Sequence, residues 1–165
     1  MRVESALSFE RVRETFLREN PDPKFGSTDY ALRLLEAANT QFGEWCSVVL
    51  SAEDSLCIML PHHTHKGLNL IPESGLLVSE VLPKIELAPK SHECPQWIQK
   101  LSQDPLSTGF LSATPLSHGD NSDYRELVRR SYKGLTHLDG LHRLIAYAKS
   151  GRSEIVACVA GLPVN

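Results

Sequence analysis

Three features that would assign a broad class are missing from the sequence. Lys and Arg number 17 against 20 Asp and Glu in 165 residues, so the formal net charge is −3 and there is no basic excess of the kind that nucleic-acid binders carry. No apolar run reaches the roughly 18 residues of a membrane-spanning helix, because residues 51–55 interrupt the longest candidate, 45–60. The N-terminus carries an acidic residue, Glu4, and lacks the apolar segment of a signal peptide. We therefore expect a cytoplasmic protein that binds neither nucleic acid nor membranes.

Cysteine is scarce and unpaired. The four cysteines contain no C-x-x-C pair, and two of them lie in apolar, strand-like runs. They are Cys46, Cys57, Cys94 and Cys158. We expect buried free thiols, and a disulfide or a metal site is the alternative.

The apolar content is sufficient for one core. Hydrophobic residues make up 41% of the chain, and the length is that of a typical domain, which predicts a single unit over residues 1–165. Ser8 is a good N-cap for a helix that must end before Pro21, and a second helix should run from residues 26–28 to Gly43. The apolar runs 45–50 and 56–60 predict a β-hairpin.

The second half alternates short helices and strands, which predicts an α+β fold. Residues 81–87, around Pro83, form a candidate strand, and a Pro at position 95 suits the first turn of a helix. The closing strand is apolar on both alternating sets, as expected of a strand covered on two faces. The further elements predicted here are helices at 95–101, 124–132 and 141–149 and strands at 134–138 and 154–160.

The segment Asp139-Gly140-Leu141-His142-Arg143 lies where a predicted strand becomes a helix. A helix N-terminus offers free amides and partial positive charge to an anion, and Gly140 has no side chain to block its approach. Arg143 can add a bidentate guanidinium, His142 can move a proton, and Asp139 can cap the helix, orient the histidine or help to hold a metal. The alternative is an ordinary capped first turn that faces water.

With the apolar helix 144–148, Gly151 and the strand 154–159, this segment resembles the D-G-x-H-R signature of the ParB/sulfiredoxin-like superfamily. The resemblance implies a core over residues 76–165, a small mixed sheet with helices, preceded by a helix–helix–hairpin extension over 1–75. The whole chain also resembles a small uncharacterised actinobacterial family, which implies no function.

Members of this superfamily share a phosphate site and differ in their reactions. Leu141 stands where sulfiredoxin has its reactive Cys, and we expect no helix-turn-helix of the partitioning proteins after the last strand. Similarity to the free-serine kinases remains, and it implies a nucleotide-dependent phosphotransferase with ATP, ADP or CTP, Mg²⁺ and a small-molecule acceptor.

The kinase resemblance also implies roles for individual residues. Asp139, Gly140, Leu141, His142 and Arg143 would hold the phosphates, with Asp139 at the metal and with His142 and Asp139 in catalysis. Glu86, on the candidate strand 81–87, would be the general base, with Glu80 and Glu93 as substitutes. His137 lies two residues before Asp139, so in a strand it faces the same side and would sit beside the ligand.

Two other functions stay open. One is a non-catalytic nucleotide- or partner-binding regulator, and the other is a biosynthetic lyase or cyclase in which His142 is the acid–base group and Arg143 holds a substrate carboxylate. The cluster His62-His63-Thr64-His65 can bind Zn²⁺ or Ni²⁺, but no nearby Cys or carboxylate in the sequence completes a set of four ligands, so we expect a surface loop. Segments 92–94 and 118–120 are further local polar clusters, and nothing indicates the oligomeric state.

Overall fold

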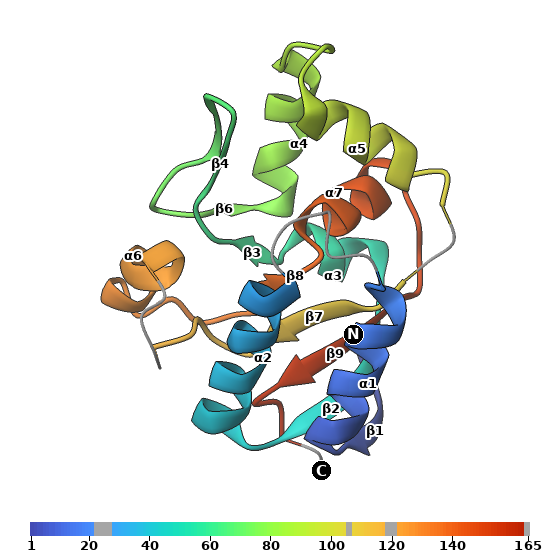
Figure 1. Cartoon of the computed structure of the whole chain (residues 1–165), viewed down its shortest axis with the longest axis vertical. Coiled ribbons are helices and arrows are strands. Elements are labelled where there is room, and N and C mark those ends of the chain that lie inside the picture. Colours follow the sequence, from blue (N-terminus) through green and yellow to red (C-terminus); the bar gives the residue numbers. More distant parts are fainter. Residues whose placement is uncertain (22–27, 105–106, 118–121, 164–165) are drawn as a thin grey trace.

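A mixed β-sheet forms the centre of the computed structural model, which describes residues 1–21, 28–104, 107–117 and 122–163 (Figure 1). Within these residues seven strands pair in the order β1-β2-β9-β7-β8-β3-β6, and β4 and β5 form a separate two-stranded hairpin. The α+β class is as predicted. The strands are β1 (Arg2–Leu7), β2 (Trp45–Leu50), β3 (Met59–Leu60), β4 (His63–His65), β5 (Leu68–Ile71), β6 (Leu76–Leu77), β7 (Gly109–Ser112), β8 (Thr136–Asp139) and β9 (Ile155–Ala160).

Strand β9 runs through the interior of the sheet. It pairs antiparallel with β2 on one side and parallel with β7 on the other. Five of its six residues are buried and only Val156 is exposed, which agrees with the apolar pattern of the sequence. The sheet thus contains strands from both predicted segments, 1–75 and 76–165.

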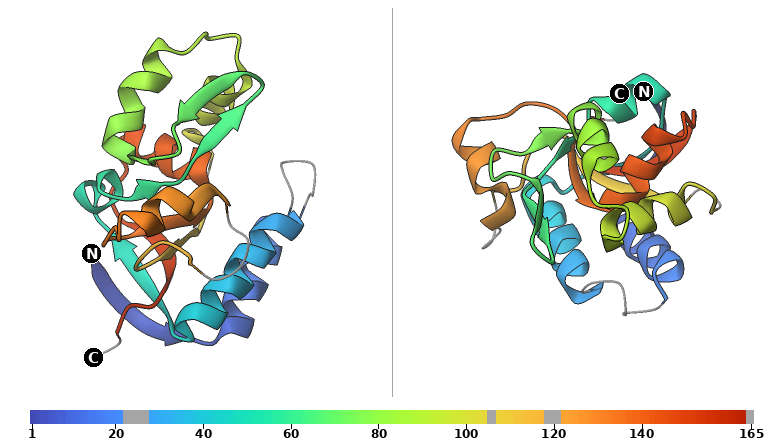
Figure 2. Two further views of the ribbon diagram at one scale, coloured as in Figure 1. Left: turned by 90° about the vertical axis from the view of Figure 1, so that its left-hand side faces the viewer. Right: turned by 90° about the horizontal axis from the view of Figure 1, so that it is seen from above.

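Helices cover both faces of the sheet, and each face has its own hydrophobic cluster. Helices α1 and α2 lie side by side on one face, and α7 packs on the other together with α3, α4 and α5 (Figures 1 and 2). The helices are α1 (Phe9–Glu19), α2 (Thr28–Phe42), α3 (Ala52–Leu56), α4 (Val78–Leu87), α5 (Glu93–Leu101), α6 (Arg125–Arg129), which follows the 3₁₀ turn η1 (Ser122–Tyr124), and α7 (Leu141–Lys149).

The helices with clear start and stop signals form where the sequence predicts them. The Ser8 hydroxyl accepts from the Arg11 amide at 3.3 Å and caps α1, and α2 ends directly before Gly43, whose φ is +71°. Helix α7 is confirmed, with Gly151 in a left-handed conformation just past its end. Helix α5 begins two residues earlier than predicted, and the charged helix predicted at 124–132 is shortened to η1 and α6.

The predicted hairpin over 45–60 is wrong. Strand β2 pairs with β1 and β9, whereas β3 pairs with β6 and β8. The residues between the two strands form helix α3, because Ser51 and Asp54 make a capping box in which the side chain of each accepts a hydrogen bond from the backbone amide of the other. The edge strand β1 was not predicted.

The candidate strand at 81–87 is also wrong, because these residues belong to α4. The Glu80 carboxylate accepts from the Leu77 amide at 2.7 Å and stabilises the start of this helix. Pro83 is six residues into the helix, where its missing N–H removes only one bond near the first turn.

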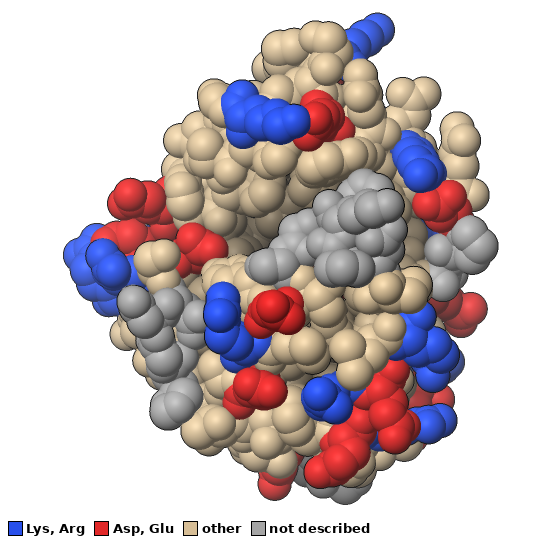
Figure 3. Space-filling model, viewed as in Figure 1, with Lys and Arg blue, Asp and Glu red and all other residues tan. Residues whose placement is uncertain are grey.

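No helix among the described residues combines the length and apolarity needed to cross a membrane. Basic and acidic side chains are interspersed on the face shown in Figure 3. All four cysteines are free; Cys57 is exposed and the other three are buried. The expectation of burial therefore holds for three of the four cysteines.

Candidate functional site

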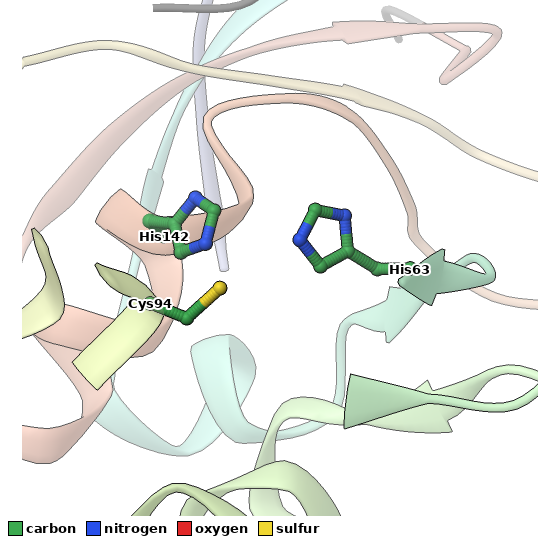
Figure 4. Close-up of side chains that lie close together, drawn as sticks. All are labelled: His63, Cys94 and His142. Carbon is green, nitrogen blue, oxygen red and sulfur yellow. The ribbon is translucent and has the colours of Figure 1, made fainter. Parts of the chain in front are cut away.

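Three separate elements bring two histidines and a cysteine together. His63 comes from β4, Cys94 from α5 and His142 from α7, and their side chains point toward one another (Figure 4). One donor atom of each, a ring nitrogen or the sulfur, lies within 4.8 Å of the other two. Cys94 is fully buried and both histidines are partly buried.

Local sequence explains how each element presents its donor. Lys66 and Gly67 have φ of +45° and +83°, as a two-residue type I′ turn requires, and this turn pairs His65 with Leu68. The register then shifts between Thr64 and His63, which pairs with Ile71. His92 is the N-cap of α5, which places Cys94 in its first turn. His142 is the second residue of α7.

Several buried ring nitrogens at and near this cluster have no hydrogen-bond partner among the described residues. Among the described residues, the buried side-chain nitrogens and oxygens without a hydrogen-bond partner all belong to histidines. They are His62 Nδ1, His63 Nε2, His142 Nε2 and both ring nitrogens of His137. A buried polar atom without a partner costs about 1–3 kcal/mol, so several such atoms in one place indicate a ligand-binding site.

Burial keeps the imidazoles neutral. Burial, together with smaller effects of the neighbouring His63 and His65, lowers the pKa of His142 to about 3. Burial, with the charges of Arg143, His63 and His142, likewise lowers the pKa of His137 to about 3, and burial also lowers the pKa of His63. Neutral imidazoles have a free lone pair, which is the form that binds metals.

The pKa of the Cys94 thiol shifts in the opposite direction. Burial, together with the nearby Glu93 carboxylate, raises the pKa of Cys94. A metal that binds Cys94 must therefore displace its proton at neutral pH.

This donor set fits a borderline or soft transition metal. Two imidazoles and one thiolate suit Zn²⁺, whereas Mg²⁺ requires oxygen ligands in octahedral geometry. Around tetrahedral Zn²⁺, bonds of about 2.0–2.1 Å to nitrogen and 2.3 Å to sulfur place the donors roughly 3.3–3.6 Å apart. The donor atoms here lie within 4.8 Å of one another, so side-chain rotations that move these atoms by about 1 Å would give that geometry.

The turn that the sequence singles out has the predicted strand–glycine–helix path. Strand β8 ends at Asp139, Gly140 is the N-cap of α7 with φ +90°, and within the described ranges no side-chain hydrogen bond caps the start of this helix. Arg143 turns back over Gly140, donates to an Asp139 carboxylate oxygen at 2.6 Å and donates to Ser107 Oγ at 3.1 Å. The guanidinium that the resemblance assigns to phosphate binding is thus engaged in an internal ion pair.

The other residues predicted for the site lie in different surroundings. Leu141 is partly buried at the start of α7, and His142 points into the cluster of Figure 4. His137 is buried in β8. Glu86 is exposed on α4 rather than on a strand.

The structure also combines residues that sequence reasoning kept apart. The expectation that His62–His65 lies in a surface loop without a nearby cysteine is wrong, because His63 and His65 belong to β4 and the fold brings Cys94 to His63. The rings of His63 and His142 are 5.3 Å apart, and the Trp97 ring is 5.2 Å from that of His142. The cluster at 118–120 lies outside the described residues.

The family model of DUF6309, described as a family of unknown function, matches residues 1–164. The chain belongs to this family. No curated protein matches the DUF6309 chain, and no solved structure matches it.

Proposed function

We propose that this DUF6309 protein is a cytoplasmic metalloenzyme that holds one Zn²⁺-like ion through His63, Cys94 and His142 and acts on a small molecule. The observation that carries the proposal is the convergence of three metal-binding side chains from three elements, with two ring nitrogens that no group of the described residues satisfies. The neutral state of the histidines supports it as well.

The number of donors favours a catalytic site over a structural one. Structural zinc sites have four protein ligands, whereas catalytic sites have three and leave a position for water or substrate. Among the described residues, the donor atoms that lie within 4.8 Å of one another at this site are three, from His63, Cys94 and His142. When bound, zinc would lower the pKa of a coordinated water to about 7, which would supply a nucleophile for hydrolysis or a base for a lyase reaction.

His137 is available to assist this chemistry. It is neutral, buried and within the electrostatic reach of both His63 and His142, and neither ring nitrogen has a hydrogen-bond partner in the part of the chain that the structure describes. A neutral imidazole in that place can accept a proton or a hydrogen bond from a ligand of the metal. A lyase or cyclase acting on a carboxylate substrate is one form of this proposal, with His142 as a ligand rather than as the acid–base group.

Cobalt titration tests the metal site directly. Co²⁺ replaces Zn²⁺ with similar geometry, and a thiolate ligand gives a charge-transfer absorption in the near ultraviolet. We expect one Co²⁺ per chain, loss of the thiolate band in Cys94→Ser, weaker binding in His142→Ala and no change in Cys57→Ser, whose cysteine is exposed. A wild type that takes up no metal, or a thiolate band that survives Cys94→Ser, would refute the site.

Activity is then measured with 4-nitrophenyl acetate on the zinc-loaded protein, on the metal-free protein and on Cys57→Ser. We expect hydrolysis that depends on the metal and is unchanged in Cys57→Ser. Stoichiometric metal binding without turnover on any ester, lyase or phosphoester probe would instead indicate a non-catalytic metal-dependent regulator.

A nucleotide-dependent phosphotransferase is the second candidate, and the bare first turn of α7 next to Arg143 favours it. ATP, ADP or CTP would bind there with Mg²⁺ at Asp139, and an anion would replace the Asp139 carboxylate as the partner of Arg143. The exposed position of Glu86 offers no support for its role as general base. Equilibrium dialysis of the wild type with each Mg²⁺–nucleotide tests this candidate, and absence of binding at millimolar nucleotide would eliminate it.

A further inference from the structure

We propose that His92 and Glu93 clasp the β4–β5 hairpin to α5 and that the metal ion enters and leaves when this clasp opens. The inference rests on the metal site proposed above. It makes His92 and Glu93 positioning residues, which act on the metal through the ligands that they hold in place.

Glu93 joins the turn of the hairpin to the start of α5. One carboxylate oxygen accepts from His65 Nε2 at 2.9 Å, and the other accepts from the Lys66 ammonium. The His65 and Glu93 side chains are 27% and 37% exposed, so water only partly screens the contact. The Trp97 ring lies 5.1 Å from the His65 ring and packs beside it.

His92 makes the second connection, and its partners determine its tautomer. Its Nε2 lies 3.1 Å from the His65 carbonyl oxygen, which can only accept, so Nε2 carries the proton. Its Nδ1 then accepts from the Cys94 amide at 3.2 Å and caps α5. One imidazole thus links the backbone of the hairpin to the residue that carries the thiol.

This arrangement couples the clasp to the ligand set. His63 is two residues before His65 on β4, and Cys94 directly follows Glu93. A closed clasp therefore holds His63 against Cys94 and His142, whereas an open one withdraws His63 and exposes the buried thiol. Because Cys94 is fully buried in the closed state, the ion needs such an opening to reach it.

Zinc release into an excess of chelator measures the opening. In Glu93→Ala we expect release to be about tenfold faster, as for the loss of one charge-assisted hydrogen bond. Glu53→Ala is the matched control, since Glu53 is an exposed acid in the first turn of α3, and it should release zinc at the wild-type rate. The cobalt–thiolate band per bound ion should be the same in all three proteins, because the ligands are unchanged.

Two conservative variants separate the contacts. Glu93→Gln keeps an acceptor for His65 but loses the charge that attracts Lys66, so it should restore most of the slow release. His92→Asn keeps an acceptor for the Cys94 amide and loses the bond to the His65 carbonyl, so it should release zinc faster than wild type with an unchanged band. If both Glu93→Ala and His92→Asn released zinc at the wild-type rate, the proposal would be overturned.

Hydrogen exchange of the metal-free proteins tests the clasp independently of the metal site. Amides of residues 63–71 should exchange faster in Glu93→Ala than in wild type or Glu53→Ala, while those of β9 stay protected. If the wild type binds no metal, the proposed function fails, and exchange still decides whether the clasp holds the hairpin. Unchanged exchange in Glu93→Ala would refute the clasp itself.

Discussion

Replacing Arg143 by Ala should destabilise the protein strongly, whatever ligand it binds. Arg143 and Asp139 form an ion pair of 2.6 Å, and their side chains are only 13% and 23% exposed. Removing one partner of a buried pair costs about 3–5 kcal/mol because the other charge is left uncompensated. Since Asp139 keeps some contact with water, we expect a loss at the lower end, about 3 kcal/mol, or roughly 6–12 °C in Tm for a chain of this size.

Urea unfolding of wild type, Arg143→Ala and Arg129→Ala measures this loss. Arg129 is 71% exposed and pairs with Glu126 on the surface, where water screens the pair, so its removal should change the free energy of unfolding little. Asp139→Asn in the Arg143→Ala background should recover part of the loss, because it removes the unpaired charge. A difference below about 1 kcal/mol between Arg143→Ala and Arg129→Ala would refute the view of a buried, stabilising pair.

The pH dependence gives an independent check. Burial raises the pKa of Asp139 and outweighs the opposing effect of Arg143, so the carboxyl group takes up a proton more readily in the folded than in the unfolded state. Without Arg143 this pKa should rise further. The folded variant then binds a proton at pH values where the unfolded chain does not, and its deficit relative to wild type should shrink as the pH falls from 8 toward 5. A deficit that grows on acidification would contradict the assignment.

Three further predictions follow from other parts of the structure. Gly75→Ala should lower the free energy of unfolding in urea by about 2 kcal/mol or more, and Gly43→Ala by about 1 kcal/mol. Both glycines have positive φ, but of the two only Gly75 has a backbone atom, the Leu60 oxygen, 2.9 Å from where a Cβ would lie. Equal losses would contradict this difference. Ser51→Ala should cost about 1 kcal/mol through loss of the α3 cap, and an unchanged Tm would argue against the capping box. Co²⁺ affinity should rise about tenfold from pH 7 to pH 8 because one proton leaves Cys94, whose pKa burial raises, and a flat profile would exclude the thiol as a ligand.

Local signals in the sequence were sufficient for α1, α2 and α7, whereas α3 and α4 were missed. The Ser8 cap, the stop at Gly43 and the turn at Gly140 act within a few residues, so the sequence contains what decides them. Strand pairing is different because the partner of a strand lies elsewhere in the chain. The apolar runs 45–50 and 56–60 look like a hairpin, and yet β2 binds the distant β9.

The candidate site was predictable only in pieces. The histidines near position 63, the polar residues around Cys94 and the turn that contains His142 are each visible in the sequence as a cluster. Nothing local shows that a hairpin, the cap of α5 and the start of α7 meet at one point. The orientation of His142, toward His63 and Cys94, depends equally on this tertiary packing.

The position of β9 has a consequence for how the chain acquires its structure. The pairs β2–β9 and β7–β9 join the half of the sheet formed by the first 50 residues to the half that carries the candidate site. Register between β2 and β9 links residues more than 100 positions apart, such as Trp45 and Ala160. Such long-range pairing implies slow folding. In any chain in which β9 is not in place, the edges of β2 and β7 that it covers are unpaired, so conditions that delay this pairing should favour aggregation.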